Sequence, residues 1–178
     1  TKAGLFDVSH MGEFRIKGMG AAALLQKLIP TNLGKLEPRK SMYSVFCKED
    51  GRVIDDLFIY MVSDQEFYLV VNAGTMEKDF NWIEKHVNAD VELVNETEQT
   101  AKIDIQGPLA EEILGTVLPP EELKKLKRFY YNDFIYQDTD MMVSRSGYTG
   151  EAGFELYVPK EVAVSLWNEL LEKGADQG

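Results

Sequence analysis

The sequence predicts an α+β protein with largely antiparallel sheets and packed helices. Apolar segments of strand length follow one another with only short polar or Gly-containing turns between them, a pattern typical of antiparallel hairpins. Stretches with apolar residues at helical spacing separate these groups of strands. Because single strands and helices do not alternate regularly, a parallel sheet is not indicated.

The first half of the chain is expected to form four strands and two helices. Residues 13–17 alternate polar and apolar side chains, and a helix over 21–29 follows and ends before Pro30. Thr75 is expected to cap the second helix, at 75–87, because its hydroxyl can accept a hydrogen bond from a first-turn amide. The three remaining strands are predicted at 42–48, 53–62 and 66–72.

The second half of the chain is also predicted to contain strands separated by helices, but it does not repeat the sequence of the first half. Strands are predicted at 91–94, 101–105, 129–136, 141–146 and 154–158. Helices are predicted at 109–118, 121–128 and 160–173, the first with Pro108 in its opening turn. A polar stretch at 95–99 is the candidate boundary, so we expect one subdomain over 1–98 and a second, incomplete at its C-terminus, over 99–178.

Composition narrows the classes of function. A formal net charge of −11 over 178 residues would repel a phosphate backbone, which argues against nucleic acid as a partner. No apolar run reaches the roughly 18 residues of a membrane span, so no membrane partner is expected. With Cys47 as its one cysteine the chain forms no internal disulfide, which fits a reducing compartment such as the cytoplasm, and His10, His86 and Cys47 are too few and too separated to predict a metal site.

The most informative feature is the doublet Asp55-Asp56 within the apolar strand segment 53–60. Period-two geometry places Asp56 with Phe58 and Tyr60 on one face, and Asp55 on the other face with further apolar residues. An ionised carboxylate buried without partners is costly, so the doublet requires an explanation. It indicates either a ligand site or a pair held by backbone amides and solvent at a sheet edge, and strand geometry alone does not choose between the two aspartates.

Other candidate binding residues follow strands or lie on them. Asn72 ends the apolar segment 69–71 and could orient a heterocycle or cap the turn. In the loop 146–155 three glycines permit close approach of a flat ligand, Tyr148 offers a stacking face, and Glu155 can accept two parallel hydrogen bonds from an amidine-like edge. A glycine-rich turn with solvated acids is the competing interpretation. Three strand aromatics add further faces, although such residues commonly belong to the core: Tyr43, Tyr130 and Tyr131.

Several motifs taken in order resemble one family along essentially the whole chain. They are FDVSHMGE at 6–13, DGRVIDDL at 50–57, VVNA at 70–73, IQGP at 105–108 and SRSGYTGEAGFE at 144–155. Together they resemble the T-protein of the glycine cleavage system, the tetrahydrofolate-dependent aminomethyltransferase. Members of that family are longer at both ends, so the resemblance implies an internal piece that covers most of the folate-binding part and that is not expected to have full activity alone.

The resemblance implies transfer of a methylene unit from the aminomethyl group on the lipoyl arm of H-protein to tetrahydrofolate, with release of ammonia and without a metal. It implies that Asp56 is the essential acid beside the folate nitrogens and leaves Asp55 a structural role. It also implies that Glu155 grips the pterin edge, that the same pocket is lined by Tyr148, Tyr43 and Asn72, and that Met11 packs nearby. Tyr130 is added as a further candidate for this pocket. The expected compartment is the cytoplasm of a bacterium or the mitochondrial matrix of a eukaryote.

Two other functions use a similar pocket. One is a folate-binding module that assists iron–sulfur cluster assembly. Proteins of that class carry a characteristic Lys-Gly-Cys-Tyr segment. That segment is absent here, since Cys47 lies in VFCK. The other is the folate domain of a dimethylglycine- or sarcosine-oxidising enzyme, which a neighbouring flavin domain would indicate.

Overall fold

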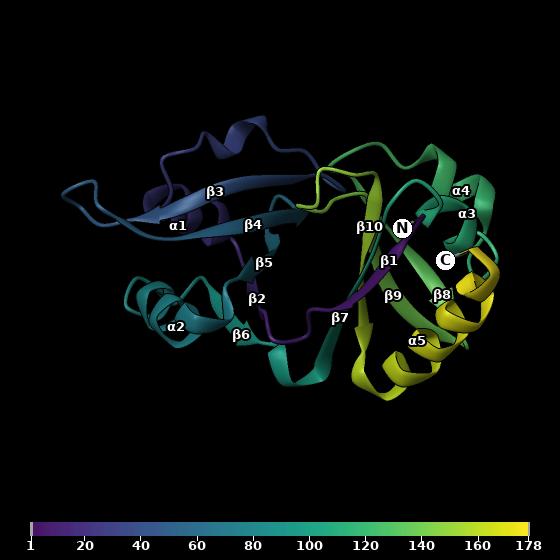
Figure 1. The fold of residues 1–178 in the computed structure, drawn as a ribbon. Coiled ribbons are helices and arrows are strands. Elements are labelled where there is room, and N and C mark those ends of the chain that lie inside the picture. The colour runs from purple at the N-terminus through teal and green to yellow at the C-terminus, as the bar shows by residue number, and fades with distance from the viewer. Residues whose placement is uncertain (1, 178) are drawn as a thin grey trace. The chain divides into compact units, whose positions relative to one another are not determined.

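A computed structural model describes residues 2–177, which form two compact units (Figure 1). We call Met11–Thr97 the continuous unit, and we call residues 2–10 together with residues 98–177 the split unit. Each unit has its own five-stranded antiparallel sheet and its own apolar core. The α+β class with antiparallel sheets and packed helices is thereby confirmed.

The continuous unit contains one sheet and two helices. The strands lie in the order β3 (Ser41–Cys47), β4 (Val53–Ser63), β5 (Glu66–Val71), β2 (Gly12–Lys17) and β6 (Glu92–Asn95). The helices are α1 (Ala21–Leu28) and α2 (Met76–Glu84), with 3-10 turns η1 (Leu33–Lys35) and η2 (Ala73–Thr75). A further 3-10 turn, η3 (Thr97–Gln99), lies where the chain passes from one unit to the other.

The core of the continuous unit forms between the helices and one face of its sheet. Helix α1 buries its predicted apolar stripe, which includes Leu25 and Leu28. On β2, Phe14 points into this core, and its ring meets the edge of the Phe80 ring of α2 at a centroid distance of 5.2 Å. Because side chains alternate along a strand, every second residue of β2, β4 and β5 faces these helices and the residues between them face away.

The split unit has the same kind of layering. Its strands lie in the order β1 (Gly4–Asp7), β7 (Thr100–Gln106), β10 (Gly153–Pro159), β9 (Thr139–Ser144) and β8 (Tyr131–Tyr136). Its helices are α3 (Ala110–Leu114), α4 (Pro120–Lys125) and α5 (Lys160–Gly174), followed by η4 (Ala175–Gln177). Figure 1 shows these helices on one side of the sheet, where Leu166 and Leu170 of α5 complete the core.

The start of the chain differs from the sequence expectation of a subdomain over 1–98. β1 forms the edge of the split unit's sheet, with register from Gly4 opposite Gln106 to Asp7 opposite Ile103. Its backbone completes the antiparallel ladder of β7, so residues 2–10 belong with residues 98–177. The strand was not predicted because its four residues show no alternation of buried and exposed side chains.

Two side chains also differ from their predicted roles. Thr75 occupies the N-cap position of α2, but its hydroxyl makes no capping bond and donates to Asp55 instead. Leu171, which helical spacing placed on the inner face of α5, is 50% exposed. No helix of the described residues is long and apolar enough to cross a membrane.

Candidate functional site

The aspartate doublet lies where β4 extends beyond the end of its neighbour β5. Pairing between the two strands begins at Leu57, opposite Val71, so Asp55 and Asp56 have ladder partners only on β3. Both aspartates are half-buried. Two carboxylates are therefore tolerated in an apolar strand because the chain after β5 leaves room for polar partners at this edge.

The side-chain amide of Asn72, the first residue after β5, lies between the two carboxylates. Its Nδ2 is 3.1 Å from Asp55 Oδ1 and 2.9 Å from Asp56 Oδ1. An amide nitrogen carries two protons, so one can be donated to each aspartate. Asn72 thus fixes the relative orientation of the two carboxylates.

Asp55 turns toward the start of α2 and is held there. In addition to the Asn72 amide it accepts a hydrogen bond from the Thr75 hydroxyl. Burial acts to raise the pKa of Asp55, but hydrogen bonds from Thr75, Asp79 and Asn72 outweigh that effect and lower it below its ordinary value. Asp55 is therefore an ionised acceptor in a structural network.

Asp56 lies on the other face of β4, together with Phe58 and Tyr60. On the neighbouring strand β3, Tyr43 lies opposite Phe58 and its hydroxyl hydrogen-bonds to Asp56. Partial desolvation, followed by the charge of Asp56 and this hydrogen bond, raises the pKa of Tyr43, which is 56% exposed. We call Asp56, Asn72 and Tyr43 the Asp56 cluster.

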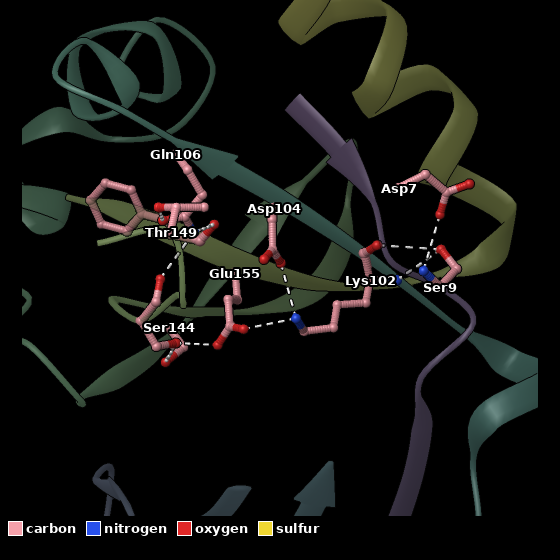
Figure 2. Close-up of polar contacts among 10 residues, drawn as sticks. Asp7, Ser9, Lys102, Asp104, Gln106, Ser144, Thr149 and Glu155 are labelled. Atoms are coloured by element: carbon pink, nitrogen blue, oxygen red, sulfur yellow. Dashed lines mark hydrogen bonds and ion pairs between the residues drawn. The ribbon is translucent and has the colours of Figure 1, made fainter. Parts of the chain in front are cut away.

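A second group of polar side chains lies on the sheet of the split unit, on the face opposite the helices. Glu155 of β10 is paired across the sheet with Asp104 of β7, and Lys102 lies two residues from Asp104 on the same face. Figure 2 shows the Lys102 ammonium between the two carboxylates, 3.0 Å from Asp104 Oδ1 and 2.7 Å from Glu155 Oε1. Ser146 donates a hydrogen bond to Glu155 Oε2. We call these four residues the Glu155 cluster.

The Glu155 cluster is strongly coupled because it is buried. The exposed fractions of Lys102, Asp104 and Glu155 are 2%, 2% and 7%. Burial acts to lower the pKa of Lys102, but the charges of Glu155 and Asp104 outweigh it and raise that pKa. Burial raises the pKa of Asp104 to about 6, a shift that Lys102 opposes and Glu155 reinforces. One fixed ammonium therefore neutralises part of the charge of two carboxylates.

The glycine-rich loop before β10 folds around the side chain of Gln106. Gln106 Nε2 donates to the carbonyl oxygens of Ser146 and Phe154, at 3.1 and 3.3 Å. A Cβ at Gly147, which has φ of +152°, or at Gly153 would lie 2.3 Å from Gln106 Oε1, so both positions require glycine. Beside this loop is a cavity of about 500 Å³ lined by Arg128, Arg145, Ser146, Gly147, Tyr148, Gly150, Glu151, Ala152 and Gly153.

The structure assembles some of the predicted site residues within one unit. Asp56, Asn72 and Tyr43 meet in the continuous unit, where half-buried Met11 directly precedes β2. In the split unit Glu155 is buried, whereas Tyr148 is 80% exposed at the cavity. Tyr130 packs against the core on the helix-covered side, away from the face that carries Glu155.

Sequence reasoning missed four residues of these networks: Lys102, Asp104, Thr75 and Asp79. For Lys102 and Asp104 a signal existed, because opposite charges two residues apart in a strand share one face. Within the described part of the chain no group of three or more His, Cys, Asp or Glu side chains is arranged to hold a metal ion.

Comparison with known proteins decides the family. Residues 1–178 match the GCVT N-terminal domain. The chain belongs to this family. Over its full length this GCVT domain is 48% identical to an aminomethyltransferase of Geobacillus sp. (strain WCH70) and 46% identical to one of Anoxybacillus flavithermus. It spans about half the length of these curated relatives, 49% in each case.

Solved structures show the same architecture. The glycine cleavage system aminomethyltransferase T from Bartonella henselae has a TM-score of 0.84 and 31% identity, over 96% of this GCVT domain and 46% of that chain. Heterotetrameric sarcosine oxidase from Corynebacterium sp. U-96 has a TM-score of 0.71 at 11% identity, over 98% of this chain and 84% of that chain. The second likeness shows a shared fold alone.

Proposed function

We propose that this GCVT domain is part of an aminomethyltransferase of glycine cleavage. The reaction would move a methylene unit from the lipoyl-bound aminomethyl group of H-protein to tetrahydrofolate and release ammonia. The Asp56 cluster carries the proposal, because it holds a carboxylate in fixed geometry on a domain 44–48% identical to proteins named aminomethyltransferase. The bacterial origin of these relatives supports a bacterial cytoplasmic enzyme.

Asp56 is assigned the catalytic role. A weakly basic amine that attacks, and a carbon that develops positive charge, are both stabilised by a fixed anion in a site with little water. Asn72 and Tyr43 hold this anion from two sides, so it does not have to reorient during the reaction. Met11, which precedes β2, is assigned to the wall of the same pocket.

Glu155 is assigned to recognition of the pterin edge of tetrahydrofolate. A carboxylate offers about four lone-pair positions, and the Lys102 and Ser146 contacts occupy one on each oxygen. A carboxylate can accept the two parallel N–H donors of an amidine-like edge, so the side-chain chemistry of Glu155 fits this ligand. Tyr148 is assigned a stacking face at the cavity, and Tyr130 remains a weaker candidate for the pocket lining because it packs against the core.

The alternative functions have less support. The likeness to sarcosine oxidase concerns the fold alone, whereas the relatives with 44–48% identity are aminomethyltransferases. No feature of the described residues favours a role in cluster assembly over aminomethyl transfer. H-protein and tetrahydrofolate are accordingly the proposed partners.

Tetrahydrofolate titration tests the proposal in the complete gene product that contains this domain. We expect Glu155→Gln to weaken binding by about 10-fold to 100-fold, since a hydrogen bond to a charged group contributes about 1.5–3 kcal/mol. Glu161→Gln is the matched control, because Glu161 is exposed on α5 and does not line the cavity, and it should leave affinity nearly unchanged. A wild-type protein that does not bind tetrahydrofolate contradicts the proposed function.

A further inference from the structure

Asp79 is a buried carboxyl group that the proposed mechanism does not use. It lies in the first turn of α2 and is 0% exposed. Neither of its oxygens accepts a hydrogen bond from an N–H or O–H donor of the described chain. An ionised carboxylate in such a place would lose its hydration without compensation, so the group must hold a proton or gain a partner.

Among the described residues, Lys78 is the one cation whose charge acts on Asp79, and its ammonium is bonded elsewhere. The charged groups that act on it are the carboxylate of Asp55 from β4 and the ammonium of Lys78 from its own helix. The Lys78 ammonium donates a hydrogen bond to the carbonyl oxygen of Ile54, at 2.7 Å in an exposed position. From β2, Gly12 meets Met76 and Phe14 meets Phe80, so that strand presents apolar atoms to this part of α2.

Asp55 is the hydrogen-bonding neighbour of Asp79. The Thr75 hydroxyl is near both groups, but it has one proton and its hydrogen bond goes to Asp55. Two facing carboxyl groups in a site of low dielectric do not both ionise at their ordinary pKa, and the one with more donors keeps the charge. Asp55 has donors from Thr75 and Asn72, so the shared proton belongs to Asp79.

We propose that Asp79 is a positioning residue of the Asp56 cluster, a neutral acid that donates a hydrogen bond to Asp55 and thereby holds the Asn72 amide against Asp56. The chain of contacts runs from α2 through β4 to the residue after β5, and each step joins a donor to an acceptor. Asp79 does not touch the reacting atoms. Its catalytic relevance rests on the proposed function, whereas its protonation does not.

The sign of the pH effect follows from this arrangement. Burial, followed by the hydrogen bond and the charge of Asp55, raises the pKa of Asp79 from 3.8 to about 7. The folded state therefore binds this proton more tightly than the unfolded chain, so the stability from Asp79 is complete in acid and is lost as pH rises from about 4 to about 7. Above about pH 7 two carboxylates face one another, and the Asn72 amide should lose its fixed position.

Carbon-13 NMR on aspartate-labelled complete gene product measures the protonation directly. The Asp79 carboxyl signal is assigned by its loss in Asp79→Asn, and we expect it to titrate near pH 7 while the Asp55 signal stays ionised. The side-chain amide signals of Asn72 should shift with the same midpoint, a readout that a merely structural carboxyl would not move. Titration of Asp79 near pH 4, or an Asn72 amide that ignores its titration, overturns the proposal.

Two variants of Asp79 separate donation from packing. Asp79→Asn keeps an N–H donor to Asp55 and should keep most of the turnover. In the wild-type protein turnover should decline above about pH 7 as Asp79 ionises, and this decline should be absent from Asp79→Asn. Asp79→Leu removes the donor and should lower kcat by about 10-fold, the factor that corresponds to the lower end for one lost hydrogen bond to a charged group. Glu77→Gln, an exposed change in the same helical turn, is the control. Equal losses in Asp79→Asn and Asp79→Leu contradict a donor role.

Failure of the proposed function remains distinguishable from failure of this inference. If the wild-type protein shows no aminomethyl transfer, the turnover comparison disappears for every variant. The carboxyl and amide titrations still decide whether Asp79 holds a proton and orients Asn72.

Discussion

Replacing Lys102 with methionine should strongly destabilise the split unit. The ammonium lies 2.7 Å from Glu155 and 3.0 Å from Asp104, and all three side chains are nearly inaccessible to water. Methionine fills a similar volume but leaves two buried carboxylates without their shared cation. Removal of one partner from a buried ion pair typically costs about 3–5 kcal/mol, and we expect a loss of that size in the free energy of unfolding at pH 7.

The same substitution should change the pH dependence of stability. In the folded wild-type protein burial raises the pKa of Asp104 from 3.8 to about 6. The contribution of Asp104 to the free energy of unfolding therefore falls by roughly 3 kcal/mol as the pH increases from about 4 to about 6. Lys102 opposes that rise. Without the ammonium the folded-state pKa should increase further, so in the variant the loss of stability should extend to higher pH.

The two tryptophans allow the effect to be measured in one unit. Trp167 of α5 packs on the core of the split unit, whereas Trp82 belongs to α2 of the continuous unit. In a Trp82→Phe background, urea unfolding followed by tryptophan fluorescence reports the split unit. The matched control is Lys124→Met, since Lys124 forms only an exposed ion pair with Glu121 and should change stability by less than about 0.5 kcal/mol. Equal effects of the two lysine substitutions would refute the reasoning.

Three further predictions concern single residues. Gly153→Ala places a Cβ 2.3 Å from a buried glutamine oxygen and should lower the free energy of unfolding by about 1–3 kcal/mol. Gly74→Ala has open space around it and should leave stability unchanged, so equal effects of the two substitutions would contradict the close packing at Gly153. Asn72→Leu leaves both aspartates of the doublet without their common donor and should cost about 1–3 kcal/mol in urea unfolding, so an unchanged midpoint contradicts the bridge. Tyr43→Phe should slow aminomethyl transfer about fivefold through loss of one hydrogen bond to Asp56, with little change in stability, and an unchanged rate excludes that contact from the reaction.

Periodicity predicted the elements well because each sheet has one face covered by helices. Strand alternation and helical spacing both follow from burial on one side. The sequence therefore predicted the bounds of β3, β4 and β5, and no end differs from the structure by more than one residue. β1 was not readable, since a four-residue strand contains too little alternation and its assignment depends on a distant partner, β7. Local pattern cannot predict such long-range pairing.

The site was only partly predictable for a related reason. Period two placed Asp55 and Asp56 on opposite faces but could not say which of them had donors. That depends on β5 ending at Val71, which brings Asn72 between the carboxylates and lets Asp55 reach Thr75. Asp79 was hidden for a different reason, since an acid in the first turn of a helix is ordinarily exposed and only tertiary packing buries it.

Aminomethyl transfer by an Asp56→Ala variant of the complete gene product tests the central assignment most directly. The assay supplies aminomethylated H-protein and tetrahydrofolate and follows release of ammonia, with Asp64→Ala in the exposed turn after β4 as the matched control. We predict a fall in kcat of at least about 100-fold for Asp56→Ala, the lower end of the contribution expected of a positioned acid or base, and a rate near wild type for the control. A near-wild-type rate for Asp56→Ala would contradict the account.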